Sequence, residues 1–386
     1  MIRFRLVAAD GAARRGLLET PHGAVETPAF MPVGTAAAVK TLAPRDLVEL
    51  GAEVVLANTY HLYLRPGHER VRRLGGLHRF MAWSGALLTD SGGFQVYSLG
   101  ADGDGPGLAR VEEEGVEFTS HLDGSRHRFT PERAVEVQEA LGADVLMAFD
   151  ECPPARADRA RHEAALARTQ RWLERCRAAW REAEARKAEA GGAPAALFGI
   201  AQGGLFSDLR RRAIEEAAAL DLPGYALGGY AVGEAPEETQ AGVERDAPLL
   251  PAEKPRYLMG VGTPADLLRA IGAGVDLFDC VLPTRCARNG LLFTSRGKLV
   301  VRNAASADDA RPADPDCRCY TCRTFSRAYL RHLFKAGETL GLRLNTLHNL
   351  QHYLDLVAGA RQAISEGRFQ SFRRERLARY REGAEP

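Results

Sequence analysis

An aspartate at the end of an apolar segment is the first residue in this sequence that could do chemistry. Asp279 closes the apolar segment 275–279 and is followed by Pro283 and Arg285, which form a rigid, basic turn. Burying an unpaired carboxylate costs several kcal/mol or shifts its pKa, so a buried segment should not end in an acid that has neither a partner nor a task. A helix cap or an ion pair is the ordinary alternative for a single aspartate.

The elements around Asp279 repeat along the chain. Eight short apolar segments predict buried strands, at residues 28–33, 53–58, 86–90, 144–150, 197–202, 225–229, 256–260 and 275–279. Amphipathic segments lie between them, and four of these follow a capping residue or a first-turn proline, at Thr130-Pro131, Ser207-Asp208, Ala235-Pro236 and Thr263-Pro264. Alternation of strands and helices is typical of a parallel sheet, and eight strands are the number that closes a (β/α)8 TIM barrel.

Polar residues stand where most of these strands end. In such barrels the chemistry lies at the carboxyl ends of the strands, where side chains from several strands converge. Those ends are Asn58, Asp90, Asp150, Gln202, Gly229, Met259 and Asp279. Carboxylates that meet at the mouth of one barrel repel and raise each other's pKa, so they do not stabilise the fold. The pattern therefore predicts a polar pocket with shifted pKa values, and it favours a chemical role for Asp279.

A cysteine cluster after the last strand indicates a metal site. Cys317, Cys319 and Cys322 lie within six residues, and His348 follows further along the chain. Three thiolates and one imidazole make a closed tetrahedral zinc site, which has no open position for water and is therefore structural. His332 and His352 are alternative fourth ligands. We expect one Zn²⁺ per chain, with a role in folding and not in the reaction.

Composition and charge narrow the class of protein. The chain has 386 residues, of which 45% are hydrophobic and 26% are charged, as in ordinary globular proteins. Its seven cysteines form an odd set that does not suggest a disulfide framework. No signal peptide and no apolar run long enough to span a membrane stands out, so a cytoplasmic location with no membrane contact is expected.

Local charge indicates where a polyanion could bind. The formal net charge is only +1, so such binding depends on patches. Residues 280–303 hold five cations and no acid, namely Arg285, Arg288, Arg296, Lys298 and Arg302. The segment from Arg361 to the end holds seven arginines and four glutamates, and it is a weaker candidate for contact with nucleic acid.

Two insertions interrupt the barrel repeat. After the third strand comes a glycine-rich loop at 100–107, followed by segments 115–120 and 127–130, which flank Asp123-Gly124 and predict a β-hairpin. The second insertion, after strand eight, is the zinc-binding subdomain, placed at residues 303–352. Residues 181–194 predict an exposed helix extension. Residues 1–386 are otherwise expected to form a single barrel domain, because no linker separates its parts.

Taken in order, these motifs resemble the bacterial tRNA-guanine transglycosylases, also called queuine tRNA-ribosyltransferases, over nearly the whole chain. The resemblance rests on the Asp279 segment, the cysteine cluster, and the motifs Asp90-Ser91-Gly92-Gly93-Phe94-Gln95, Ala148-Phe149-Asp150-Glu151-Cys152, Gly199-Ile200-Ala201-Gln202-Gly203-Gly204, Gly228-Gly229-Tyr230-Ala231-Val232-Gly233-Glu234 and Tyr257-Leu258-Met259-Gly260-Val261-Gly262. The family fold is a (β/α)8 barrel with a zinc-binding insertion near the C-terminus, and its members are usually homodimers.

The resemblance implies a base exchange in queuosine biosynthesis. Guanine at the first anticodon position of a tRNA would be replaced by a 7-deazaguanine, with 7-aminomethyl-7-deazaguanine (preQ1) as the expected base. Asp279 would be the nucleophile that forms a covalent ribosyl intermediate, as in a retaining glycosidase. Asp90 would be the general acid and base. By the same resemblance, the zinc ligands are Cys317, Cys319, Cys322 and His348.

The resemblance also assigns the base-binding residues. Asp150 would accept hydrogen bonds from guanine, Gln202 and the Gly229 N–H would donate to its carbonyl oxygen, and Phe94 and Met259 would sandwich the ring. Arg285 and Arg288 would hold neighbouring nucleotides of the splayed anticodon loop.

Four positions bear on which base is preferred. Cys152 and Val232 match positions that go with preQ1 in bacterial members. Tyr230 stands where some members have leucine, and Phe94 replaces a tyrosine, so the width of the pocket is not fixed by the resemblance.

Three other functions fit parts of the pattern. A retaining glycosidase would share the barrel and the paired acids, but its cleft is normally lined with tryptophan, and this chain has three. A catalytically silent tRNA-binding subunit would be expected to lose its nucleophile, whereas Asp279 and Asp90 are both present. A metal-dependent amidohydrolase would carry a His-x-His motif at the end of the first strand, and residues 28–33 contain none.

Overall fold

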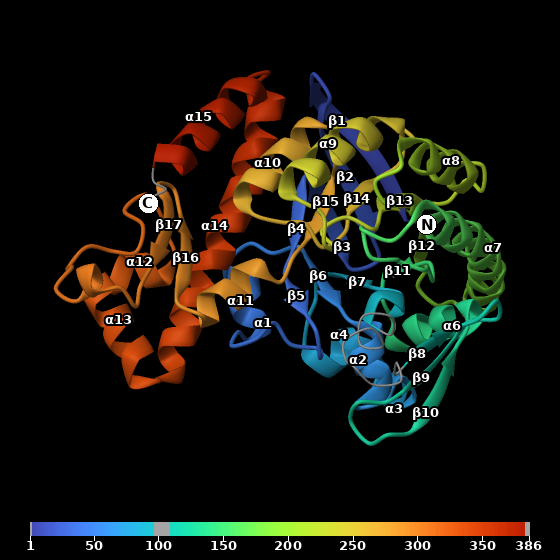
Figure 1. Ribbon diagram of the computed structural model, residues 1–386. Coiled ribbons are helices and arrows are strands. Elements are labelled where there is room, and N and C mark those ends of the chain that lie inside the picture. Colours follow the sequence, from blue (N-terminus) through green and yellow to red (C-terminus); the bar gives the residue numbers. More distant parts are fainter. Residues whose placement is uncertain (1, 96–108, 383–386) are drawn as a thin grey trace.

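The computed structural model describes residues 2–95 and 109–382. At its centre is a closed parallel barrel (Figure 1), with strand segments in the order β4-β15-β14-β13-β12-β11-β7-β6-β5. β4 pairs with β15 and β5 pairs with β6, and these two segments are halves of one strand interrupted at Pro32. The nine segments therefore make eight strands, and the predicted (β/α)8 TIM barrel is confirmed. The segments are β4 (Ala29–Met31), β5 (Val33–Gly34), β6 (Val54–Ala57), β7 (Ala86–Thr89), β11 (Val145–Met147), β12 (Ala196–Ala201), β13 (Gly224–Leu227), β14 (Arg256–Leu258) and β15 (Leu277–Asp279).

The barrel strands are apolar on both faces because both faces are buried. Every residue of β6 and of β12 is buried. Successive side chains alternate between the barrel interior and the surrounding helices, so Val54 and Leu56 pack inside while Val55 and Ala57 pack outside. Each predicted strand segment overlaps an observed strand, although β12 and β13 each begin one residue earlier than predicted. Several end sooner than predicted, because the polar residues that follow leave the ladder at the mouth of the barrel.

Helices surround the barrel and begin largely where their capping residues predict. The Thr130 side chain accepts a hydrogen bond from the Arg133 N–H, and Thr263 caps its helix in the same way. The prediction of a cap at Ser207 is wrong, because Ser207 is the first helical residue and Phe206 precedes it. The helices are α1 (Pro44–Glu49), α2 (Thr59–Leu64), α3 (His68–Arg73), α4 (Gly76–Met81), α6 (Pro131–Leu141), α7 (Arg159–Glu189), α8 (Ser207–Ala218), α9 (Pro236–Asp246), the short η1 (Ala247–Leu249), α10 (Pro264–Gly272) and α11 (Leu282–Arg288).

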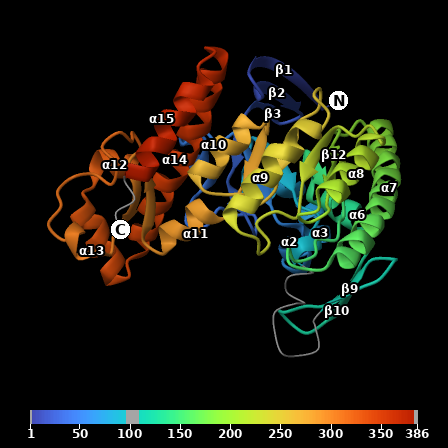
Figure 2. The ribbon, with the colours of Figure 1, turned by 45° about the horizontal axis from the view of Figure 1, so that its top comes forward.

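An antiparallel sheet that the sequence did not predict closes the amino-terminal end of the barrel. It consists of β1 (Arg3–Asp10), β2 (Ala13–Thr20) and β3 (Gly23–Thr27). Leu18 and Val25 complete the apolar cluster inside the barrel. Arg14 pairs with the buried Asp276 at 3.0 Å, just before β15 begins. Figures 1 and 2 show this sheet at the end of the barrel opposite the insertion β8–β10.

The first insertion contains the predicted hairpin. Strands β9 (Val116–Thr119) and β10 (Arg126–Phe129) pair antiparallel around the turn that holds Gly124, whose φ of 74° suits glycine. β8 (Ala109–Val111) adds a third strand. The predicted glycine-rich loop at 100–107 lies outside the described residues. The predicted helix extension at 181–194 is helical up to Glu189, where α7 ends.

The C-terminal part packs against one side of the barrel, as the orange and red segments of Figure 2 show. Its elements are β16 (Leu291–Thr294), β17 (Gly297–Val300), η2 (Ala304–Ser306), α12 (Tyr320–Thr324), α13 (Arg327–Ala336), α14 (Thr339–Ser365) and α15 (Phe369–Glu382). The long α14 joins this part to the barrel, because Arg361 donates to the carbonyl oxygen of Pro28 at 2.8 Å. None of the helices within residues 2–95 and 109–382 is long and apolar enough to cross a bilayer.

Candidate active site

One open cavity of about 520 Å³ lies at the carboxyl ends of the barrel strands. Every strand-end residue named from the sequence lines it, namely Asn58, Asp90, Asp150, Gln202, Gly229, Met259 and Asp279. Phe94, Cys152, Tyr230, Val232 and Arg285 line it as well. Residues far apart in the chain thus meet because each follows a neighbouring barrel strand.

Asp90 is a buried carboxyl with three hydrogen-bond donors. Asn58 Nδ2 and Gln95 Nε2 donate to its Oδ2, at 2.5 and 2.8 Å, and the Thr59 N–H donates to its Oδ1 at 2.7 Å. Burial raises the pKa of Asp90 to about 6 against the effect of these donors, and the charge of Asp279 raises it further. A carboxyl with a pKa near 6 can both give and take a proton close to neutral pH.

Asp279 is the last residue of β15 and is held on one oxygen. The Tyr257 hydroxyl and the Gly260 N–H both donate to its Oδ1, at 2.6 and 2.7 Å. Burial raises the pKa of Asp279, and these two donors oppose the rise. These two hydrogen bonds orient the side chain. Among the described residues, no cation forms an ion pair with it. A carboxylate kept this way remains available as a nucleophile.

Asp150, Gln202 and Gly229 lie next to one another in the lining of the cavity. Gln202 Nε2 donates to Asp150 Oδ2 at 2.6 Å, and the Ser91 hydroxyl donates to Asp150 Oδ1 at 3.3 Å. Burial raises the pKa of Asp150 to about 6. Gln202 Oε1 is buried without a hydrogen-bond partner in the described part of the chain. This set offers both acceptors and donors to a flat polar ligand.

The walls of the cavity differ in how firmly they are held. Phe94 is 49% exposed, whereas Tyr230 is 3% exposed and its hydroxyl donates to Asp246 Oδ2 at 2.5 Å. Burial raises the pKa of the Cys152 thiol to about 12, so this thiol stays protonated. The Tyr230 ring is thus anchored to α9, which a leucine at this position would not be.

The two predicted tRNA-binding arginines lie on α11 and differ in their surroundings. Arg285 is exposed and lines the rim of the cavity. Arg288 does not line the cavity, and one of its nitrogens donates to the Thr284 carbonyl oxygen at 2.9 Å. Arg285 is therefore the arginine that a strand of nucleotides leaving the cavity would meet first.

The roles of two residues that hold the carboxyls were not predicted from the sequence. Tyr257 is fully buried in β14 and reads as an ordinary core aromatic, yet it donates to Asp279. Asn58 was recognised as a strand end but not as the donor to Asp90. The only feature of the sequence that could have indicated these two roles is a polar side-chain atom on a residue next to the mouth of the barrel.

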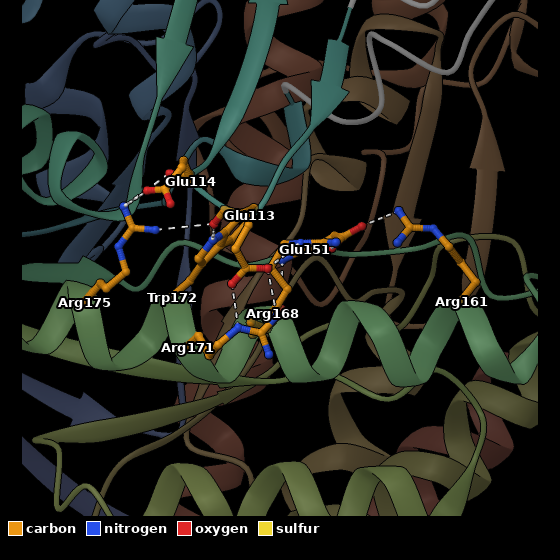
Figure 3. A network of polar contacts seen from close by, with 9 residues as sticks. Glu113, Glu114, Glu151, Arg161, Arg168, Arg171, Trp172 and Arg175 are labelled. Carbon is orange, nitrogen blue, oxygen red and sulfur yellow. Dashed lines mark hydrogen bonds and ion pairs between the residues drawn. The ribbon is translucent and has the colours of Figure 1, made fainter.

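A network of charges fixes the loop that carries Asp150 (Figure 3). The neighbouring Glu151 is buried, and Arg161 and Arg168 on α7 each contact one of its carboxylate oxygens. Arg168 also lies 3.6 Å from Glu113, in the turn between β8 and β9. The network ties the first insertion, α7 and the end of β11 together, so Asp150 sits on a rigid support.

The cysteine cluster is assembled as predicted. Ligand atoms of Cys317, Cys319, Cys322 and His348 all lie within 4.8 Å of one another. His348 Nε2 lies 2.9 Å from the Phe293 carbonyl oxygen, and its Nδ1 lies 3.2 Å from Cys322 Sγ. A hydrogen bond from one ring nitrogen that leaves the other facing three thiols suits a metal ligand. This cluster could hold a metal ion.

The two alternative histidines lie elsewhere. His352 Nε2 is 3.0 Å from the Tyr380 hydroxyl, and the His332 ring stacks on Tyr329. Neither belongs to the cluster of ligand atoms in the described part of the chain.

Comparison with known proteins agrees with this arrangement. A family model described as queuine tRNA-ribosyltransferase matches residues 10–382. The chain is 57% identical over 379 residues to the queuine tRNA-ribosyltransferase of Nitratidesulfovibrio vulgaris, which covers 98% of this chain and 97% of that protein. It is 55% identical over 370 residues to that of Oleidesulfovibrio alaskensis, with 96% and 94% covered, and 55% identical over 369 residues to that of Pelotomaculum thermopropionicum, with 95% of each covered. The chain belongs to the queuine tRNA-ribosyltransferase family.

Proposed function

We propose that this chain, a tRNA-guanine transglycosylase by its family, replaces guanine at the first anticodon position of tRNA with preQ1 through a covalent aspartyl-ribosyl intermediate. The observation that carries the proposal is the pair of carboxyls in one cavity. Asp279 is oriented by hydrogen bonds and Asp90 has a pKa of about 6. A nucleophile and a proton carrier are the two groups that such an exchange needs.

The first step would cleave the bond between ribose C1′ and guanine N9. Because Tyr257 and Gly260 both donate to Oδ1 of Asp279, Oδ2 is the oxygen we assign to attack C1′. The electron pair of the broken bond leaves with guanine, which Asp90 protonates. Asp90 then takes a proton from the incoming base, whose nitrogen attacks C1′ and releases Asp279. Two inversions give overall retention.

The base would be recognised by a second group of residues that line the cavity. Asp150 accepts from its N–H donors, and Gln202 with the Gly229 N–H binds its carbonyl oxygen, while Phe94 and Met259 stack on its faces. Cys152 and Val232 line the same cavity, at positions that fit preQ1. The Tyr230 side chain is held against α9 by its hydrogen bond to Asp246. It can therefore leave room for the substituent at position 7 of the base.

The anticodon loop would enter along α11. Arg285 at the rim is assigned to a phosphate beside the flipped nucleotide, and Arg288 to a more distant one. We place the protein in the cytoplasm, where its tRNA substrate is found, and as a homodimer. Sedimentation at micromolar concentration would test the dimer, which a purely monomeric species would contradict.

Incorporation of radiolabelled guanine into unmodified tRNA tests the proposal as a whole. The label should enter a tRNA with guanine at the first anticodon position and not a variant with adenine there. Unlabelled preQ1 should then chase the label out of the RNA. A silent tRNA-binding subunit would incorporate no labelled guanine, and neither would a glycosidase. Absence of label from the tRNA would therefore refute the proposal.

We assign zinc to the Cys317, Cys319, Cys322 and His348 cluster, whose donor set fits a closed structural site. Prolonged chelation should release about one zinc per chain and lower the melting temperature. At such sites the free energy of metal binding contributes directly to the stability of the fold. The metal would be counted by elemental analysis alongside calorimetry. Cys286→Ser, which changes a thiol outside the cluster, should keep the full metal content. A metal-free protein with an unchanged melting temperature would contradict the assignment.

A further inference from the structure

Arg210, on the second turn of α8, is a fully buried arginine that the mechanism above does not use. Its guanidinium donates to four backbone carbonyl oxygens. Nε donates to Gly204 at 2.7 Å, Nη1 to Ala201 at 3.1 Å and to Gly228 at 2.6 Å, and Nη2 to Gly229 at 3.2 Å. Burying a charge costs free energy unless protein groups replace the water around it. The four carbonyl oxygens do this for Arg210, and together they fix the position of its guanidinium.

The four carbonyl groups belong to two segments only. Ala201 and Gly204 flank Gln202 after β12, and Gly228 and Gly229 follow β13. These are the two segments that present the assigned contacts to the carbonyl oxygen of the base. Arg210 therefore bridges the ends of two neighbouring strands from behind the cavity, which it does not itself line.

The two bridged segments also touch each other. A Cβ added at Gly229 would lie 2.4 Å from Gln202 Oε1, and one at Gly228 would lie 2.7 Å from Gln202 Nε2. The Gln202 amide thus lies directly on the backbone of its neighbour. A shift of either segment by a few tenths of an ångström would move both contacts to the base.

Tyr230 and Asp246 hold Arg210 in place. The guanidinium carbon lies 4.0 Å from the centre of the Tyr230 ring, close enough for a cation–π contact. Tyr230 donates to Asp246 at 2.5 Å, and Asp246 Oδ2 lies 3.8 Å from Arg210 Nε. Gly242 on α9 leaves room for the ring, because a Cβ there would lie 2.5 Å from the Tyr230 hydroxyl oxygen.

We propose that Arg210, anchored by Tyr230 and Asp246, is a positioning residue for the base. It fixes the Gln202 and Gly229 segments at the separation at which both reach the carbonyl edge of one purine. This rests on the proposed roles of Gln202 and Gly229. Tyr230 therefore contributes to base recognition through the contacts of its ring with Arg210 and of its hydroxyl with Asp246.

Steady-state kinetics with guanine and tRNA varied separately tests this role. Arg210→Lys keeps the charge but loses the planar fork, so the KM for guanine should rise about tenfold while the KM for tRNA changes less than about twofold. Tyr230→Phe keeps the ring and removes only its hydroxyl, and it should raise the KM for guanine by about threefold. Arg212→Lys, at an exposed position on the same helix, should change neither constant.

Two comparisons separate positioning from a general loss of structure. Arg285→Ala at the rim should show the reverse pattern, an unchanged KM for guanine and a higher KM for tRNA, whose difference from the unaltered protein narrows as salt is added. In a double-mutant cycle with Gln202→Ala, the effect of Arg210→Lys on the KM for guanine should be clearly smaller, because the part that acts through Gln202 is already lost and only the part that acts through Gly229 remains.

Some results would overturn the inference. They are a lower melting temperature of Arg210→Lys with no change in the KM for guanine, an equal rise in both KM values, or additive effects in the cycle. These failures differ from failure of the proposed function, in which the unaltered protein itself would incorporate no guanine.

Discussion

Asp279→Asn is expected to eliminate guanine exchange, with a loss of at least about 10⁴-fold, because the neutral amide cannot form the ribosyl bond. The fold should be retained, since the asparagine Oδ1 can still accept from Tyr257 and Gly260. Denaturing gel electrophoresis after incubation with tRNA alone would show the covalent adduct in the unaltered protein and none in the variant. Binding of tRNA, measured by filter retention, should persist.

A matched control lies at the opposite end of the same strand. Asp276 precedes β15 and pairs with Arg14 at 3.0 Å, outside the active-site cavity. Asp276→Asn should cost about 3–5 kcal/mol of stability, because it leaves Arg14 buried without its partner. It should still form the adduct at low temperature. An adduct in Asp279→Asn, or its loss in both variants alike, would remove Asp279 from the role of nucleophile.

Asp90→Asn is expected to slow both half-reactions by about 10²–10⁴-fold, the usual contribution of a general acid or base. The sign of the pH dependence should differ between them. Departure of guanine needs Asp90 protonated, so the rate of adduct formation should fall as the pH rises through about 6. Attack by the new base needs Asp90 ionised, so the rate of adduct consumption should rise over the same range.

Single-turnover measurements on each half-reaction would resolve the falling limb of one pH–rate profile and the rising limb of the other. In Asp90→Asn both limbs near pH 6 should be absent. Asp150 also has a pKa of about 6, so it provides the control. Asp150→Asn should weaken binding of the base but keep the two limbs. If the limbs survive in Asp90→Asn, the proton is carried by another group.

The positions of the carboxyls that line the cavity could be predicted because they follow from the strand period. A barrel strand buried on both faces is a continuous apolar run, so a polar residue after it marks the mouth. Asp90, Asp150 and Gln202 were found in this way, although none of them is informative alone. The cysteine cluster was equally visible, because three cysteines so close together have few other uses.

Other features could not be predicted from the sequence. Strand β1 carries Arg3 and Arg5 and is largely exposed, so its pattern does not distinguish a strand from a surface segment. Arg210 lies on a helix beside Arg211 and Arg212, where a solvated charge is the ordinary reading. Only the close approach of two loops in space, which no local pattern encodes, makes it a buried anchor. Tyr257 was missed because a tyrosine within a buried strand reads as a core residue, and its hydroxyl meets Asp279 only through the pairing of β14 with β15.

The pairing of β4 with β15 has a consequence for biosynthesis. Residues 29–31 leave the ribosome long before residues 277–279, which are their hydrogen-bonding partners on one side. Until that late strand is translated, the nascent barrel has an unsatisfied apolar edge, of the kind that recruits other chains into aggregates. Arg361, which donates to Pro28, emerges later still. The growing polypeptide therefore depends on protection of its first barrel strand through most of its synthesis.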